Sequence, residues 1–325
     1  QSNAFYKNYD ADKHTTLLTN EVIWSPKNWI TSNGLVNSLE GMVKNRNYEA
    51  KNTKNEYKTE GTINELSGVV SFKSSLPMKK KGINFSKIVS PNFMLRYAPG
   101  HMRDLSGDDV NLNYANLYSM NKTSEIEDGL SAILGLDFKI NEKDENGNDK
   151  EKMSFSIGQV FNRKQNEDIP SKSSLDQKTS DVVGEFNYNF SKIGNIAYKF
   201  SLDHNLNDLN YNEVSSNFNL GKVDFNIDYL EQRNHVGTEH SLGTGVAVNF
   251  NDHNKLSYST KKNYKTDSTE LYDISYQYQI DCLTAGLVFR REFYKDSDVE
   301  EKDTLMFKIT FVPFGGAKTP SIIKP

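Results

Sequence analysis

Apolar and polar residues alternate along the second half of the chain, from about residue 181 to Phe314, in runs of about ten residues separated by turns. In the run 181–190, for example, Phe186 and Tyr188 fall on one side while Asn187 and Asn189 fall on the other. A period of two places successive side chains on opposite faces of a β-strand. The pattern therefore predicts many strands, each with one apolar and one polar face.

Period-two runs and turn signals predict about sixteen strands over the whole chain. Their approximate spans are 16–25, 34–46, 61–76, 86–97, 110–121, 128–140, 152–163, 181–190, 195–205, 209–219, 222–233, 241–250, 254–265, 269–280, 282–294 and 303–313. The mean spacing of about 20 residues per strand is wider than the 8–12 residues typical of a small sandwich. The alternation is weaker before residue 110 than after it.

No helical pattern lies between these strands, so no helices are available to cover their apolar faces. Another apolar environment must therefore surround these faces. Lipid around a closed cylinder meets this need. We therefore expect an all-β chain that forms an antiparallel transmembrane β-barrel of the outer-membrane type. Two alternatives remain open at this point: a partly disordered, Asn/Lys-rich soluble chain, and a soluble or surface-exposed β protein that does not transport anything.

The predicted barrel assigns the two faces of its strands to water and to lipid. The polar positions of two runs would face the lumen: Asp224, Asn226, Asp228, Asp273, Ser275 and Gln277. The apolar positions of the last run would face lipid: Leu305, Phe307, Ile309 and Phe311.

Composition agrees with a wall in which only every second residue meets lipid. Apolar residues make up 36% of the chain and the mean hydropathy is −0.70, which is low for a soluble protein with a thick core. The net charge of −4 gives no basic excess for nucleic acid, so we expect no nucleic-acid partner. No run of about 18 apolar residues predicts a transmembrane helix.

Linkers in the second half alternate between short turns and longer, charged loops. Short linkers include 191–194 and 251–253, and longer ones include 204–209 and 234–240. Outer-membrane barrels have short periplasmic turns and longer extracellular loops, so the short linkers predict the periplasmic end. The longest loop of this half, 163–180, contains Pro170 and many polar residues, and we expect a mobile surface loop there.

The sequence contains no motif typical of an enzyme, so we expect neither catalysis nor a cofactor. The six histidines show no metal-ligand spacing, although His235, Glu239 and His240 lie close together in a predicted loop. The acidic run 144–149 has its glycine out of register for a calcium loop, and a polar turn is the simpler interpretation. We therefore predict no metal site.

Several short segments of this sequence, taken in order, resemble segments of one known family. They are Arg96-Tyr97-Ala98-Pro99-Gly100-His101-Met102-Arg103, Asn116-Leu117-Tyr118-Ser119-Met120-Asn121-Lys122, Glu125-Ile126-Glu127-Asp128-Gly129, Phe155-Ser156-Ile157-Gly158-Gln159-Val160-Phe161, Tyr276-Gln277-Tyr278-Gln279-Ile280-Asp281-Cys282 and Gly286-Leu287-Val288-Phe289-Arg290-Arg291-Glu292-Phe293. This order resembles the C-terminal barrel region of LptD (also called OstA or Imp), the lipopolysaccharide-assembly family of the outer membrane.

The resemblance implies a function and a set of partners. The barrel would receive lipopolysaccharide from periplasmic bridge proteins, through an N-terminal domain that this sequence lacks, and insert it into the outer leaflet. An LptE-like lipoprotein would plug the lumen, and lipid would leave where the first and last strands meet. The 325 residues would then be the C-terminal part of a larger barrel, with the seam strand at 303–313. A passive porin-like or other outer-membrane channel is the alternative function.

The resemblance also bears on the single cysteine, Cys282, and on the chain ends. The family commonly has adjacent cysteines here, bridged to its N-terminal region; in this chain Leu283 replaces the second. Cys282 is therefore a candidate for a disulfide to the absent N-terminal region. Residues 1–4 could be a vector scar. Residues 315–325 would form a periplasmic tail.

Overall fold

The computed structural model shows an all-β protein built on one antiparallel sheet. The structure describes residues 2–10, 13–51, 61–100, 102–123, 125–144, 146–190, 192–292, 302–311, 315–318 and 322–323. Within these ranges no helix is long and apolar enough to cross a membrane. A short 3₁₀ turn, η1 (Ser171–Ser173), is the helical element among them.

The strands follow one another in chain order around the sheet. They are β1 (Ser2–Asp10), β2 (Lys13–Trp24), β3 (Trp29–Ile30), β4 (Val36–Lys51), β5 (Gly61–Ser75), β6 (Met78–Lys81), β7 (Phe85–Ala98), β8 (Gly129–Lys143), β9 (Asp149–Asn162), β10 (Val182–Asn189), β11 (Gly194–Leu202), β12 (Leu209–Asn219), β13 (Val223–Gln232), β14 (His240–Asn249), β15 (Asn254–Asn263), β16 (Ser268–Ile280), β17 (Leu283–Glu292), β18 (Lys302–Phe311), β19 (Gly315–Lys318) and β20 (Ile322–Ile323).

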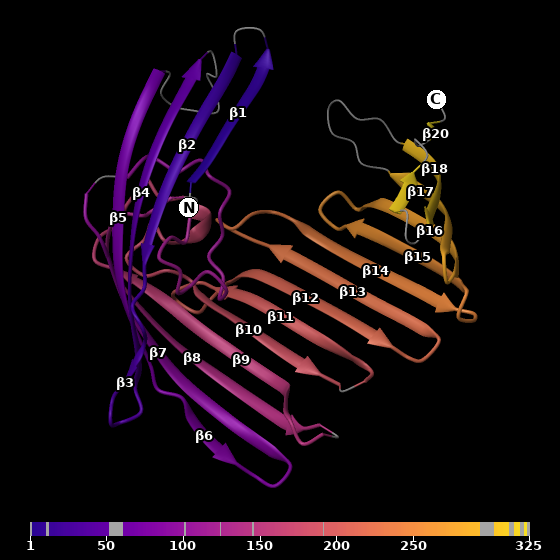
Figure 1. Cartoon of the computed structure of the whole chain (residues 1–325), viewed down its shortest axis with the longest axis horizontal. Helices are drawn as coiled ribbons and strands as arrows, with labels where there is room; N and C mark the ends of the chain where they lie inside the picture. Colours follow the sequence, from indigo (N-terminus) through magenta and orange to yellow (C-terminus); the bar gives the residue numbers. More distant parts are fainter. Residues whose placement is uncertain are drawn as a thin grey trace.

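Sixteen of these strands form a continuous curved wall, in the order β1, β2, β4, β5 and then β7 to β18, each antiparallel to the next. Figure 1 shows this wall as a trough with β1 at one rim and β18 at the other. The described residues contain no pairing between β1 and β18, so their sheet is open there. Fifteen of the sixteen predicted strands are present in this wall. The predicted and observed numbers of wall strands agree only because two errors offset each other: one predicted strand is absent, and β1 was not predicted.

Two prolines divide what would otherwise be longer strands. Pro26 lies between β2 and β3, which both pair with β4, and Pro77 lies between β5 and β6, which both pair with β7. Proline has no backbone N–H to donate to a ladder, so it is tolerated at such breaks. The wall keeps its order across both breaks.

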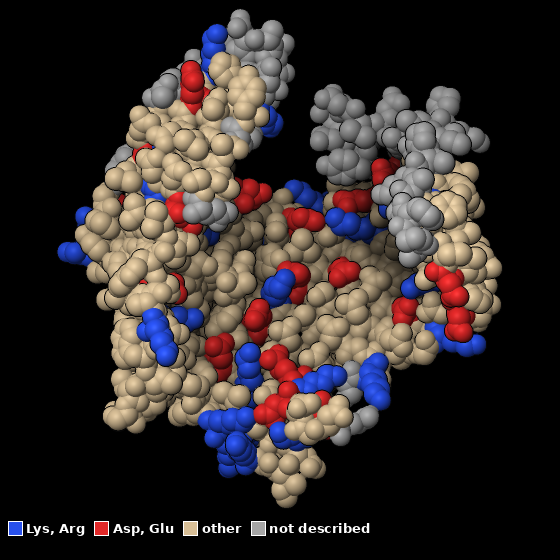
Figure 2. Space-filling view, in the orientation of Figure 1, with Lys and Arg blue, Asp and Glu red and all other residues tan. Residues whose placement is uncertain are grey.

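The two faces of the wall differ in chemistry, as the alternation predicts. The convex face carries exposed large apolar residues such as Leu134, Tyr276, Leu287 and Phe307, which are 42–51% exposed. The concave face carries charged side chains of both signs, which Figure 2 shows spread across the trough. An exposed apolar band around a polar interior is the arrangement of an outer-membrane barrel.

One predicted strand is wrong. Residues 110–121 form no strand but belong to a connection between β7 and β8, residues 99–128, which we call the inserted segment. Figure 1 shows it folded into the concave side of the trough. Leu112 and Leu117 are set among polar residues as in a strand, yet both are buried in a compact cluster on the inner face of the sheet. Asn113 and Asn116 accept hydrogen bonds from each other's backbone N–H at 2.9 and 3.0 Å, which holds a local turn instead.

The loop predicted to be mobile at 163–180 is instead packed. Residues 163–181, which we call the β9–β10 loop, bury Ile169 and Leu175 at 5% and 3% exposure in the same cluster as the inserted segment. These two apolar residues hold the loop against the cluster. They were visible in the sequence, but the otherwise polar composition of the loop favoured a mobile surface segment.

Both chain ends pair with the sheet. Ser2–Ala4 pair with Leu18–Asn20 at the start of β1, and their origin as a vector scar stays a prediction. The tail contains β19 and β20, which both pair with β18. The described part of the tail thus continues the sheet beyond the expected seam strand. Its periplasmic location stays a prediction.

Candidate functional site

Two glycines on the inner face form the floor on which the inserted segment lies. Gly135 of β8 and Gly158 of β9 are directly paired across the ladder. A Cβ built on Gly135 would collide with the Tyr118 hydroxyl, and one on Gly158 would collide with the Leu117 side chain. Each would also lie 2.8 Å from a backbone oxygen, which cannot move aside easily. The missing side chains therefore let the inserted segment approach the sheet backbone.

A carboxylate on the same face fixes the segment above this floor. Asp137 of β8 accepts a hydrogen bond from the Tyr114 hydroxyl at 2.6 Å. It also accepts from the Ser156 hydroxyl at 2.7 Å and from the Asn92 amide at 2.6 Å. Three donors from the segment and from two neighbouring strands satisfy one carboxylate, so Tyr114 has a defined place on the wall.

An ion pair holds the other end of the inserted segment. Arg96 of β7 contacts the Glu127 carboxylate at 2.9 Å, and the two side chains are only 3% and 5% exposed. Arg96 also donates to the carbonyl oxygens of Met120 and Glu127. The second Glu127 oxygen accepts from the backbone N–H groups of Lys122 and Thr123. Because nearly every polar atom of this pair has a partner, the buried charges are compensated.

A second acidic residue of the segment reaches a different strand. Glu125 pairs with Lys44, at 2.6 Å, and with Arg46, both from β4. Beside it, Met120 and Ile126 are buried against Met42 of β4. The inserted segment therefore joins the β4 side of the trough to the β7–β9 floor.

The β9–β10 loop is tied to the inserted segment by polar and apolar contacts. The Asn166 amide donates to the Asp128 carboxylate at 2.5 Å. The Leu105 backbone N–H donates to the Asp168 carbonyl at 2.7 Å, and Lys172 pairs with Asp109 at 2.7 Å. The two segments thus form one packed layer on the concave side.

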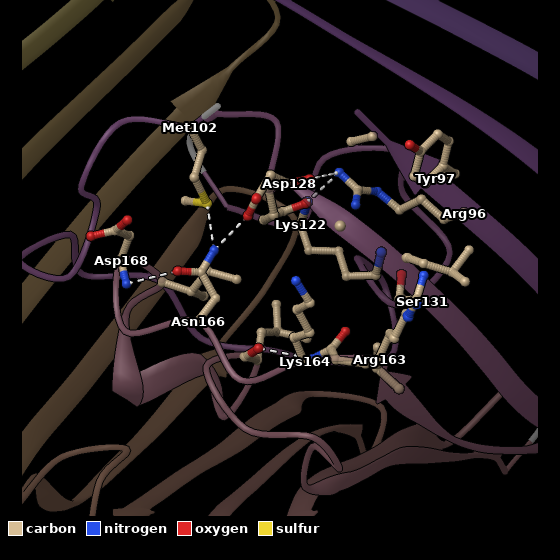
Figure 3. Close-up of a pocket in the computed structure, with 18 of the residues that line it drawn as sticks. Arg96, Tyr97, Met102, Lys122, Asp128, Ser131, Arg163, Lys164, Asn166 and Asp168 are labelled. Atoms are coloured by element: carbon tan, nitrogen blue, oxygen red, sulfur yellow. Dashed lines mark hydrogen bonds and ion pairs between the residues drawn. The ribbon is translucent and has the colours of Figure 1, made fainter. Parts of the chain in front are cut away.

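A cavity of about 450 Å³ lies between these two segments and the inner face of β7 to β9. Its walls include four cations and three anions, namely Arg96, Lys122, Arg163, Lys164, Glu127, Asp128 and Asp168. In Figure 3, Asp168 lies at the left of the cavity, whereas Lys164, Lys122 and Arg163 lie from the centre to the right. Apolar contacts come from Met102, Val160, Ile169 and Leu175.

Lys122 is the buried cation of this cavity, at 5% exposure. Its ammonium group donates to the Ser119 carbonyl at 3.1 Å. Burial and, after it, the nearby Arg96 charge lower the pKa of Lys122 to about 8, against the opposing attraction of Glu127. The cavity therefore contains a buried cation whose ammonium group bonds to a neutral backbone oxygen.

The six polar residues expected in the lumen share the concave face with this cavity but lie farther along the sheet. Asp224 accepts from Asn219, Asn249 and Lys255 at 2.6 to 3.2 Å. Asp273 pairs with Arg290 at 2.8 Å. The others bond to polar neighbours: Asn226 to Asp228, Ser275 to Ser257, and Gln277 to Gln279. They form a polar surface and do not converge on one point.

The residues expected on the seam strand lie together on the convex face of β18. Leu305, Phe307 and Phe311 are 44–48% exposed, and Ile309 is half-buried. Phe307 is directly opposite Leu287 of β17, and Leu305 is opposite Phe289. The strand is thus part of the same exposed apolar band as its neighbour.

Cys282 is exposed in the tight turn between β16 and β17. Its predicted disulfide remains a prediction. The histidines considered for metal binding diverge: His235 contacts Asp181 at 3.1 Å, whereas His240 packs against Tyr229 and Tyr264. The described residues contain no cluster of three or more side chains that could hold a metal ion.

Sequence reasoning missed the cavity residues. The sequence analysis named Arg96 only as part of a segment, residues 96–103, that carries the family resemblance. Its position offered a further signal, because it shares a strand face with Met94 and Ala98, two residues away on either side, which are buried on the inner face. A charged residue in such a row requires a buried partner, but Glu127 is 31 residues away and no local spacing identifies it.

Comparisons with known proteins identify a family. The family model described as "LptD: LPS transport system D" matches residues 3–281. Among solved structures, engineered mutants of the porin from Rhodopseudomonas blastica are similar at low identity. One mutant is 10% identical with a TM-score of 0.33 and covers 86% of each chain. A triple mutant of the same porin is 9% identical with a TM-score of 0.32 and covers 81% of this chain and 91% of the porin. No curated protein matches.

Proposed function

This chain belongs to the LptD family, whose barrels transport lipopolysaccharide in the outer membrane, and we propose that it inserts lipopolysaccharide into the outer leaflet through its lumen and a lateral seam. The family match carries the proposal. Porin-like passive transport is the alternative outcome of the tests below.

The two faces of the wall support a role in moving an amphipathic lipid. Acyl tails and exposed side chains such as Leu287 and Phe307 are both apolar, so the convex face suits hydrocarbon. Sugars and phosphates need hydrogen-bonding groups, which the concave face supplies through Asp224, Asn226 and Ser275. One wall can thus separate the two halves of the same molecule.

The seam strand supports sideways release. An unpaired strand edge is costly in lipid, because its N–H and C=O groups have no water to bond. A seam with few ladder hydrogen bonds is easier to open, because fewer backbone groups lose their partners when its strands separate. β18 has ten ladder positions with β17 but only four with β19 and two with β20 among the described residues. The β18 edge that faces away from β17 is therefore the weaker side.

The proposed partners follow from the family. An LptE-like lipoprotein would occupy the concave side, and periplasmic bridge proteins would deliver lipid through an N-terminal domain. Cys282, exposed in the β16–β17 turn, would form the disulfide to that domain.

Locking the seam tests the proposal in the intact protein. One cysteine replaces Ile309 of β18, and a second is placed at the facing position of the strand that closes the full barrel. We expect the disulfide to stop the appearance of new lipopolysaccharide at the cell surface and a reductant to restore it. Surface lipopolysaccharide that continues at the normal rate would contradict lateral release.

A matched disulfide controls for rigidity alone. Thr284 of β17 and Thr310 of β18 are directly paired, so T284C/T310C links two strands that are already neighbours. Export should continue in this variant. If both disulfides leave export intact but reduce uptake of small solutes, the passive channel becomes the better function.

A further inference from the structure

We infer that the cavity between the inserted segment and the β9–β10 loop binds an anionic phosphate group on the headgroup of the transported glycolipid. The inference rests on the proposed function and deepens it by naming a contact point for the cargo. It is argued from the charges that line the cavity, from their partners and from the size of the space.

Among the described residues, three of the four cations around the cavity have no carboxylate within ion-pair distance. Arg96 is neutralised by Glu127 at 2.9 Å. Lys122 donates to a carbonyl oxygen, and the side chains of Arg163 and Lys164 make no hydrogen bond or ion pair within the described part of the chain. They come from both the inserted segment and the β9–β10 loop, so the fold brings together cations distant in sequence.

The remaining acidic residues do not cancel this charge. The charges of Arg96 and Glu127 cancel in their ion pair. Three cations and two carboxylates then remain around the cavity, which is a formal excess of one positive charge. Asp128 already accepts the Asn166 amide, and Asp168 lies across the cavity from the cations in Figure 3. An anion placed beside Lys122, Arg163 and Lys164 would therefore meet net attraction.

Lys122 gives the strongest reason to expect a ligand. A buried ammonium group is costly unless it is paired, and here burial lowers its pKa to about 8. A bound anion would supply the missing partner and favour the charged form. Lys122 is also only five residues from Glu127, whose ion pair with Arg96 fixes this part of the segment against β7.

The volume suits a headgroup fragment and excludes the whole lipid. A cavity of about 450 Å³ lies in the range of ~300–1,000 Å³ typical of small-molecule sites. Phosphate needs several donors around one centre, which Arg and Lys side chains provide. The apolar walls at Val160 and Leu175 could contact the face of the attached sugar ring. The same chemistry could hold free phosphate, so the test separates the two sources.

The test measures binding of purified lipopolysaccharide to the intact protein in detergent. The probes are lipopolysaccharide, the same material after enzymatic dephosphorylation, and inorganic phosphate. We expect R163Q/K164Q to weaken binding of phosphorylated lipopolysaccharide by at least about tenfold, since charge-assisted hydrogen bonds are lost. Both residues are exposed, so the variant should fold. K150Q removes an exposed lysine at the opposite end of the β8–β9 hairpin and should bind normally.

A second variant tests the buried cation. K122Q removes the charge but keeps hydrogen-bonding capacity, and phosphorylated lipopolysaccharide should again bind at least about tenfold more weakly. If K122Q fails to fold, the exposed double variant still decides the question.

Each outcome has one meaning. Weaker binding of the dephosphorylated lipid to the wild type, with no further loss in R163Q/K164Q, supports the site. Equal binding of both lipids, or equal binding by R163Q/K164Q and wild type, overturns the site while leaving transport intact. Binding of inorganic phosphate without competition against the lipid overturns the glycolipid assignment. A wild-type protein that binds neither lipid counts against the proposed function itself.

Discussion

Arg96 of β7 and Glu127 of the inserted segment form an ion pair with a nitrogen–oxygen distance of 2.9 Å, although the two side chains are only 3% and 5% exposed. Such a pair contributes little net stability by itself, because both charges lose their water. Removing one partner is far more costly, since the other charge is left buried. The pair therefore specifies where the inserted segment ends against the wall.

The first prediction concerns this pair. R96M leaves Glu127 without its cation and should lower the free energy of unfolding by about 3–5 kcal/mol. Urea unfolding of the protein in detergent micelles measures this, and limited proteolysis reports release of residues 99–128. The double variant R96M/E127L removes both charges of the pair and should recover part of the loss, but not all of it, because the backbone N–H groups of Lys122 and Thr123 lose their acceptor.

An exposed ion pair nearby provides the control. Lys172 and Asp109 are 42% and 81% exposed, and K172Q should change stability by less than about 1 kcal/mol. If R96M were no more harmful than K172Q, the anchoring role of Arg96 would be wrong.

The second prediction concerns the glycine floor. G158A places a methyl group where Leu117 now lies and 2.8 Å from the Leu134 carbonyl oxygen. Overpacking of this kind costs about 1–3 kcal/mol, and we expect the inserted segment to lift from the sheet and become sensitive to protease.

Gly286 gives the matched control for that experiment. It also lies within a strand of the wall, but a Cβ there would meet no atom closer than 3.8 Å. G286A should therefore keep the stability of the wild type. Equal effects of G158A and G286A would show that general strand propensity, and not the contact with Leu117, explains the loss.

Most of the wall could be predicted from the sequence because its two faces meet different surroundings. From β8 onward the strands have alternating residues, such as Phe186 and Asn187 on β10, whose opposite faces appear as period two. Residues 110–121 show the limit of this argument. Their apolar residues are spaced among polar ones too, but they pack as a cluster against Gly158, Ile133 and Val183, and period two does not distinguish a strand from a turn-rich segment buried on another sheet.

The cavity could not be predicted, for a related reason. Lys122, Arg163 and Lys164 are brought together by the packing of two loops, and that packing depends on contacts such as Asn166 with Asp128, which are 38 residues apart. Local pattern contains no information about such long-range pairs. The polar composition of the β9–β10 loop predicted a mobile surface, whereas two buried apolar residues, Ile169 and Leu175, fix it in place.

The third prediction is a pH dependence of the loop between β13 and β14. His235 in this loop contacts Asp181, and that contact raises the pKa of His235 above 6.5, with Asp176 and Asp203 adding to the effect. Burial raises the pKa of Asp181, but bonds from His235, Asn210 and Ser201 outweigh it and hold that pKa below 3.8.

The two shifts define the pH window in which the contact stabilises the fold. The contribution of His235 is fully present below pH 6.5 and is lost as the pH rises through its raised pKa. The contribution of Asp181 is present above pH 3.8 and is lost as the pH falls through its lowered pKa. Thermal unfolding should therefore show extra stability between pH 3.8 and 6.5 that H235Q removes. A pH profile unchanged in H235Q would refute the link.

The fourth prediction concerns Cys282. If the expected disulfide to the N-terminal region exists, the native protein should change mobility on a non-reducing gel when treated with reductant, and C282S should lose that change. Full labelling of Cys282 by a maleimide in unreduced envelopes would show that the thiol is free. The exposed position of Cys282 makes both experiments practicable.

The fifth prediction separates the two faces of a single strand. Leu287 is 47% exposed on the convex face near the middle of β17, and Val288 is its neighbour on the concave face. In a lipid-facing position an arginine costs about 2–4 kcal/mol at the membrane midplane, whereas in a polar lumen it remains hydrated. The free energy of unfolding of L287R in lipid should therefore be lower than that of the wild type by about that amount. The free energy of unfolding of V288R should stay much closer to the wild-type value. The measurement is the urea midpoint of folding into lipid vesicles for both variants. Equal destabilisation by the two variants would contradict the assignment of the convex face to hydrocarbon, and a larger effect of V288R than of L287R would reverse the orientation of the wall.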